Sequence, residues 1–129
     1  MLRRSIGAAV VLLVGLVALA DASQALKGYE LYSWKVKGRW HYAVLAGTNR
    51  AKSYEEITSP DNERVGLAAL KAELKKLPRG EEVFWRSAAH PGVARPRAKG
   101  SPILELPSRQ RIKQVKAYCD KLGLELNLR

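Results

Sequence analysis

The sequence predicts a small α+β protein, a two-layer sandwich with a mixed sheet of four or five strands and two helices on one face of the sheet. Three observations predict this fold class. The segment 29–45 has the composition of a β-hairpin, two later segments each have one apolar stripe at helical spacing, and two further short segments have strand patterns. Because each helix has a single stripe, both can cover the same face of one small sheet.

The hairpin segment, YELYSWKVKGRWHYAVL, is the strongest strand signal in the chain. We expect a three-residue loop, Lys37-Gly38-Arg39, that places Trp34 opposite Tyr42. A slip of one residue would exchange the core and solvent faces. We expect the aromatic face to be core, with a stacking platform for bases or sugars as the alternative. In this register one face collects Tyr32, Trp34, Val36, Trp40, Tyr42 and Val44.

The first predicted helix follows a turn at residues 47–50 and a short helical turn at 54–57. The turn lacks the glycine and lysine spacing of a nucleotide-binding loop. Ser59-Pro60-Asp61 is typical of a helix start, with a capping hydroxyl, a proline at the first position and then an acid. The apolar stripe of this helix follows at spacings of three, four and three, in Leu67, Leu70, Leu74 and Leu77.

In the second half, residues 81–87 predict a third strand and residues 88–102 a long loop rich in Pro, Gly and Arg. A short strand at 103–106 comes next. Ser108 is the expected N-cap of a second helix that ends at Gly123 in a left-handed conformation. The last predicted element is a half-buried strand at 124–128. The sequence does not determine the order of the strands in the sheet. The stripe of the second helix and the apolar side of the last strand are Ile112, Val115, Cys119 and Leu122, then Leu124, Leu126 and Leu128.

Residues 1–22 are predicted to be a secretory signal peptide, which leaves a single domain over residues 23–129. Two arginines precede an apolar run at 6–20, and a helix of that length spans only about 22 Å of the ~30 Å hydrocarbon core. Cleavage is expected after Ala22, with Ala20 and an uncleaved anchor as alternatives. We therefore expect an exported, periplasmic or secreted protein without stable membrane insertion after cleavage. The segment from Tyr29 to Arg50 resembles small exported bacterial proteins, a resemblance that implies no activity.

The chain is strongly basic, with 23 Lys and Arg against 12 Asp and Glu and a formal charge of +11. Much of the excess lies in residues 86–116, where Glu105 is the single acid. A cationic loop next to a helix N-terminus suits polyanions. The candidate anion-binding or partner-binding residues are Arg86, Arg95, Arg97, Lys99, Arg109, Arg111 and Lys113.

We expect a small exported binding protein that contacts an anionic envelope polymer, a lipid or an acidic protein partner. Export argues against a nucleic-acid partner, and the oligomeric state is left open. One Cys excludes a disulfide framework, and no metal site, cofactor or catalytic residue is assigned. Cys119 is expected to be a small buried hydrophobe. The alternatives are a small enzyme or enzyme subunit that uses His41 or His90, and a structural or inhibitor-type partner.

Overall fold

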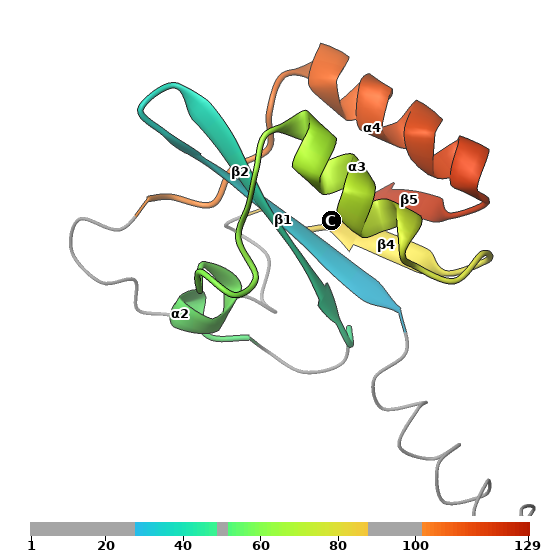
Figure 1. Ribbon diagram of the computed structural model, residues 1–129, viewed down its shortest axis with the longest axis horizontal. Helices are drawn as coiled ribbons and strands as arrows, with labels where there is room; N and C mark the ends of the chain where they lie inside the picture. The colour runs from blue at the N-terminus through green and yellow to red at the C-terminus, as the bar shows by residue number, and fades with distance from the viewer. Residues whose placement is uncertain (1–27, 49–51, 88–101) are drawn as a thin grey trace, which may run out of the picture.

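A computed structural model of the chain describes residues 28–48, 52–87 and 102–129 (Figure 1). Five strands and three helices lie in these residues. In chain order they are β1 (Tyr29–Val36), β2 (Arg39–Ala46), α2 (Tyr54–Ile57), β3 (Arg64–Val65), α3 (Leu67–Lys75), β4 (Glu82–Trp85), α4 (Arg109–Leu122) and β5 (Glu125–Leu128).

The strands form one mixed sheet in the order β3-β2-β1-β4-β5. The hairpin strands β1 and β2 are antiparallel, as are β2 and β3, whereas β1 pairs with β4 and β4 with β5 in parallel. A mixed five-stranded sheet with helices packed on it confirms the predicted α+β class. The hairpin lies inside the sheet, and β5 lies at one edge.

The predicted hairpin register is wrong by one residue. The loop is the two-residue Lys37-Gly38, and Trp34 lies opposite His41. Both loop residues have positive φ, 50° and 80°, which fits the turn that best matches the twist of paired strands. The expectation assumed that only one face is buried. In the structure both faces of the hairpin are covered. Aromatic side chains that point to either face are therefore buried in an apolar cluster.

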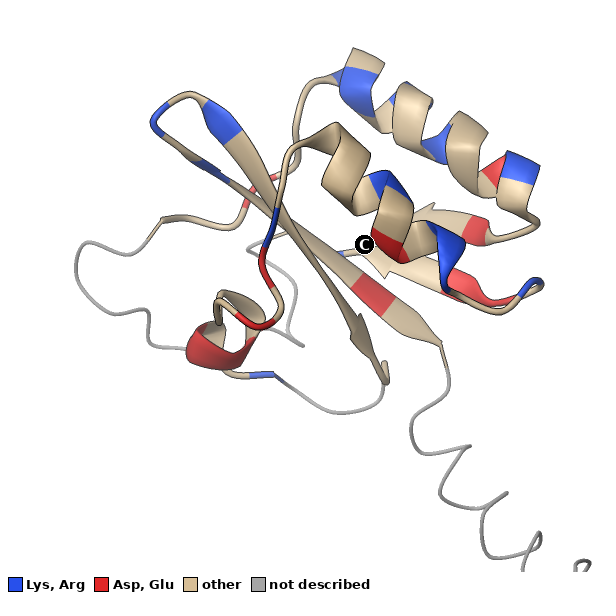
Figure 2. Ribbon diagram, viewed as in Figure 1, with Lys and Arg blue, Asp and Glu red and all other residues tan. Residues whose placement is uncertain are grey.

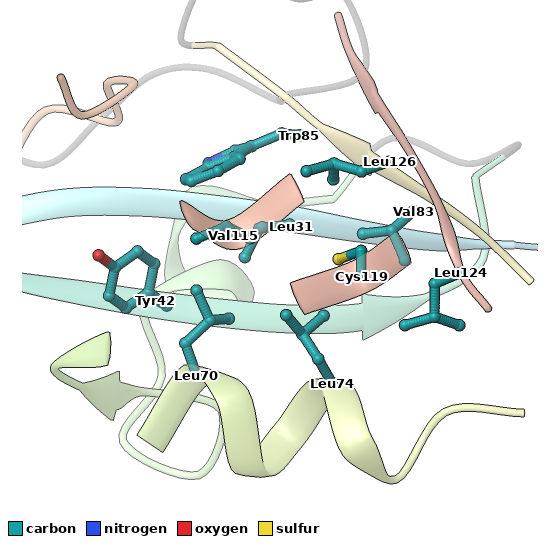
Figure 3. Close-up of a cluster of buried hydrophobic side chains, with 10 residues drawn as sticks. All are labelled: Leu31, Tyr42, Leu70, Leu74, Val83, Trp85, Val115, Cys119, Leu124 and Leu126. Carbon is teal, nitrogen blue, oxygen red and sulfur yellow. The ribbon is translucent and has the colours of Figure 1, made fainter. Parts of the chain in front are cut away.

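The two faces of the sheet carry separate apolar clusters. One cluster joins the sheet to α3 and α4, which contact each other (Figure 3). The other lies on the opposite face of the hairpin strands, under α2 and Leu104. The aromatic side chains are therefore core residues, not a stacking platform. The first cluster contains Leu31, Tyr42, Leu70, Leu74, Val83, Trp85, Val115, Cys119, Leu124 and Leu126, and the second contains Tyr32, Trp34, Ala43, Tyr54, Ile57 and Leu104.

The predicted helix start at Ser59 is also wrong, because α3 begins only at Leu67. Ser59 instead caps a turn, since its hydroxyl accepts from the backbone N–H of Asp61 and its carbonyl from two N–H groups further on. The chain then pairs with β2 as β3. Gly66, with a φ of 88°, starts the helix without a side-chain cap. A capping sequence thus marks a turn as readily as a helix.

The other local predictions fare better. The helical turn at 54–57 is α2, the third strand is β4, and the last strand is β5. Both predicted ends of α4 are confirmed: the Ser108 hydroxyl accepts from Arg111 N–H, and Gly123 is left-handed. The strand expected at 103–106 is reduced to one bridge between Leu104 and Trp34.

Several predictions concern residues outside the described ranges. They are the signal peptide at 1–22, the end of the turn at 47–50, and nearly all of the loop at 88–102 with its His90. Among the residues that the structure describes, no helix has the length and apolar character needed to cross a bilayer.

Candidate functional site

The best-defined part of the basic segment is α4. Its inner side packs on the first cluster through Val115 and Cys119, with further apolar contacts from Ile112, Tyr118 and Leu122. This packing fixes the rotation of the helix, so the remaining positions must face solvent. Three exposed cations, Arg109, Lys113 and Lys116, follow at spacings of four and three and therefore share one side. We call Arg109, Lys113 and Lys116 the basic α4 face (Figure 2).

Few acids balance this face. Lys116 lies 3.6 Å from Asp120, one turn further on, and both side chains are more than half exposed. Within the described residues, Arg109 and Lys113 make no ion pair. Exposed cations without carboxylate partners keep most of their hydration and stay available to an anion.

Arg111 has a different position from its neighbours in the sequence. Its guanidinium donates to the Tyr42 hydroxyl on β2 at 2.8 Å, and the residue is partly buried. This bond ties the first turn of α4 to the hairpin. A shallow polar hollow lies here, lined by Ser108, Gln110, Arg111 and Gln114. Arg111 therefore borders the basic α4 face and anchors its end.

The hairpin end supplies further cations that the sequence argument passed over. Lys35, Lys37 and Arg39 are exposed on the two strand ends and the loop between them (Figure 2). Lys35 also lies over the Trp40 ring, 5.8 Å from its centroid. The signal in the sequence was the alternating spacing of these three residues.

Arg86 does not belong to the exposed basic surface. It is 7% exposed, and its Nε donates to Glu30 Oε2 at 2.6 Å. Lys52, which is fully buried, donates to the other carboxylate oxygen of Glu30 at 2.5 Å and to the Gly47 carbonyl. The Tyr32 hydroxyl donates to that same Glu30 oxygen. We call Glu30, Tyr32, Lys52 and Arg86 the buried ionic cluster.

The buried ionic cluster is a structural feature whose parts come from distant places in the chain. Burial and the nearby negative charge of Glu30 raise the pKa of the Tyr32 hydroxyl far above its usual range, so this group stays a neutral donor. The carboxylate joins β1, the segment before α2 and the end of β4. Removing one partner of such a buried cluster leaves an uncompensated charge. Sequence reasoning missed Glu30 and Lys52. The signal was an acid on the face of β1 that also carries Tyr32 and Trp34.

The groups considered for catalysis are placed as follows. His41 Nδ1 is hydrogen-bonded to Glu63 Oε2, and its ring stacks on Trp34 with centroids 6.0 Å apart. The hollow at the start of α4 includes neither His41 nor Glu63. Cys119 is buried, and burial, aided by the charge of Asp120, raises the pKa of its thiol to about 11. A thiol in that state is a poor nucleophile.

Of the seven candidate residues, α4 brings together Arg109, Arg111 and Lys113, whereas Arg86 lies in the buried ionic cluster. Arg95, Arg97 and Lys99 lie outside the described ranges. The part of the chain that the structure describes holds no group of three or more His, Cys, Asp or Glu side chains arranged for a metal ion. Fold and surface thus define a basic α+β sandwich. Comparison with known families, curated proteins and solved structures finds no match for this chain.

Proposed function

We propose that this chain is a small exported binding protein whose basic α4 face contacts an anionic polymer of the cell envelope. The observation that carries the proposal is the set of cations on this face, Arg109, Lys113 and Lys116, which has only Asp120 as an acidic neighbour among the described residues. A row of cations at helical spacing matches a repeating anion better than it matches a single small ligand.

The other long helix shows that such a face is not a necessary result of a basic composition. On α3, Glu73 accepts from Arg64 at 2.7 Å and from Lys76 at 3.2 Å. Burial favours the protonated form of Glu73, but these two donors outweigh it and lower the pKa of the carboxyl. Lys71 lies 5.2 Å from the centroid of the Tyr118 ring. Arg64, Lys71 and Lys76 thus have partners within the fold.

The test compares two triple charge reversals on a heparin column, with the protein in the form in which cells accumulate it. The first variant carries Arg109→Glu, Lys113→Glu and Lys116→Glu. The second carries Lys71→Glu, Lys75→Glu and Lys76→Glu and serves as the matched control, because both variants change the net charge equally. We expect the α4 variant to elute at a much lower salt concentration than the α3 variant, since only the α4 residues would contact the polymer.

The same pair is then applied to isolated anionic envelope polymer, which distinguishes the proposed ligand from a generic polyanion. Equal loss of retention per reversed charge in both variants would mean that the whole basic surface attracts anions without a preferred site, and this outcome would refute the proposal. Thermal unfolding of both variants verifies that each is folded.

A further inference from the structure

β5 lies at the edge of the sheet, and only one side of its backbone is hydrogen-bonded to β4. Glu125 N–H donates to the Glu81 carbonyl, Arg129 N–H donates to the Trp85 carbonyl, and Ser87 N–H donates to the Arg129 carbonyl. Alternate residues of a strand turn their backbone groups to opposite sides. Leu126 and Leu128 therefore direct their N–H and C=O groups away from β4. Among the described residues, no strand pairs with this edge.

β5 begins at Glu125 and is followed directly by Arg129, so the strand has opposite charges at its two ends. Glu125 lies beside Glu82 in the register of β4 and β5, and both carboxylates are exposed. At the other end, the Arg129 guanidinium lies 4.9 Å from the centroid of the Phe84 ring, and the Arg86 guanidinium lies 5.2 Å from it. The acidic end thus places like charges next to each other, an arrangement that lowers sheet stability unless an opposite charge approaches. At the basic end Arg86 is already paired with Glu30, so Arg129 supplies the exposed charge.

We infer that β5 pairs with β5 of a second copy of this chain, in antiparallel orientation about a two-fold axis at Asn127. This register places Glu125 of each copy opposite Arg129 of the other, so the acidic end of one strand meets the basic end of its partner. Leu126 lies opposite Leu128 of the second copy, and these are the residues whose backbone groups face outward. The backbone pattern and the charge pattern thus select the same register.

The apolar side of β5 supports the same pairing. Leu126 belongs to the first cluster and is 7% exposed, whereas Leu128, on the same side of the strand, is 50% exposed. In the paired strands Leu128 lies next to Leu126 of the second copy, so the dimer extends the cluster across the two-fold axis. The two sheets become one continuous sheet, and the exposed edge that invites uncontrolled strand pairing is removed.

The test measures self-association by sedimentation velocity over a series of protein concentrations, with the protein in the form in which cells accumulate it. We expect a concentration-dependent monomer–dimer equilibrium. Glu125→Arg alone places two arginines opposite each other at both ends of the two-fold interface and should weaken the dimer by roughly tenfold or more. Arg129→Glu alone should do the same with two carboxylates. The double variant, Glu125→Arg with Arg129→Glu, restores opposite charges and should recover the dimer.

A control variant, Glu55→Arg on α2, reverses an exposed acid on a helix that packs on the hairpin strands and should leave the dimer unchanged. Hydrogen exchange supplies a second readout. The amides of Leu126 and Leu128 should gain protection as the concentration rises, while those of Glu125 and Arg129 are protected throughout. A chain that stays monomeric at every concentration overturns the inference, as does a double variant that fails to recover the association lost in the single variants.

Discussion

The two long helices differ far more on their outer sides than on their inner sides. Each buries two residues in the same apolar cluster, Leu70 and Leu74 on α3 and Val115 and Cys119 on α4. Outside, Glu73 pairs with nearby cations at α3, whereas the basic α4 face makes a single ion pair among the described residues, between Lys116 and Asp120. Packing on the sheet therefore explains the inner sides of both helices. It does not explain why Arg109 and Lys113 on the outer side of α4 have no ion pair among the described residues, and that difference is the basis of the proposed function.

The largest expected effect on stability comes from a substitution on the inner side of α3, which packs in the apolar cluster that α4 shares. Leu74→Ala should lower the free energy of unfolding by roughly 2–5 kcal/mol, because Leu74 is fully buried and its loss leaves a cavity. The matched change on the exposed side, Lys75→Ala, should stay within about 0.5 kcal/mol. Urea unfolding of both variants measures the difference. Similar urea midpoints for the two variants would contradict the structure, because they would mean that Leu74 is not on the buried side of α3.

α4 begins with a capping side chain and α3 does not, so the next largest effect is expected at the start of α4. Ser108→Ala should cost about 1 kcal/mol of stability, since the hydroxyl accepts from Arg111 N–H. Ser108→Gly should cost only a few tenths of a kcal/mol, because glycine leaves the amides open to water. α3 begins at Gly66 without a side-chain cap, so it has no equivalent bond to lose. Equal losses for Ala and Gly at position 108 would argue against the cap.

Cys119 on α4 makes the stability depend on pH in the alkaline range. Burial raises the pKa of its thiol to about 11, above the usual value near 9. The folded state therefore holds this proton more tightly than the unfolded state. The resulting stability is fully present below about pH 9 and is lost as the pH rises towards 11. Cys119→Ala should remove this part of the pH dependence when urea midpoints are compared across that range.

The same burial should protect Cys119 from thiol reagents in the native protein. We expect a disulfide exchange reagent to label it only as fast as the protein unfolds. Rapid labelling under native conditions would contradict the buried position of this thiol.

The smallest effect concerns the ion pairs beside α3. Glu73→Gln should cost about 0.2–1 kcal/mol at neutral pH, because its partners are partly exposed. Since the pKa of Glu73 is lowered in the folded state, this contribution is present above the ordinary pKa of a glutamate and is lost as the pH falls through the lowered value. Wild type and variant should thus converge in stability in acid, and a gap that persists at low pH would exclude the ion pairs as its source.

The sequence predicted features that depend on local signals and missed those that depend on contacts between distant residues. The ends of α4 followed from Ser108 and Gly123, because capping is a property of a few adjacent residues. The hairpin register failed because it depends on the loop conformation and on burial of both faces. The partner of Glu30 in the buried ionic cluster could not be identified from the sequence, because Glu30 and Arg86 become neighbours only when β1 and β4 pair.

The candidate site was predicted in part for the same reason. Helical spacing could place Arg109 and Lys113 on one side of α4, but the stretch of sequence that contains them also contains Arg86, which the fold buries. A count of charges along the chain does not separate exposed cations from those held in a core. The basic α4 face is thus a smaller and more specific target than the segment that first suggested it.

The most direct measurement of the central claim is the salt dependence of binding to a sulfated heparin oligosaccharide by titration. Each cation that contacts a polyanion contributes on the order of 0.7–0.9 to the slope of log affinity against log salt concentration. The account predicts that Arg109→Glu, Lys113→Glu and Lys116→Glu together reduce this slope by about 2, whereas the matched reversal at Lys71, Lys75 and Lys76 reduces it by less than about 1. Equal reductions of the slope in the two variants would contradict a specific role for the basic α4 face.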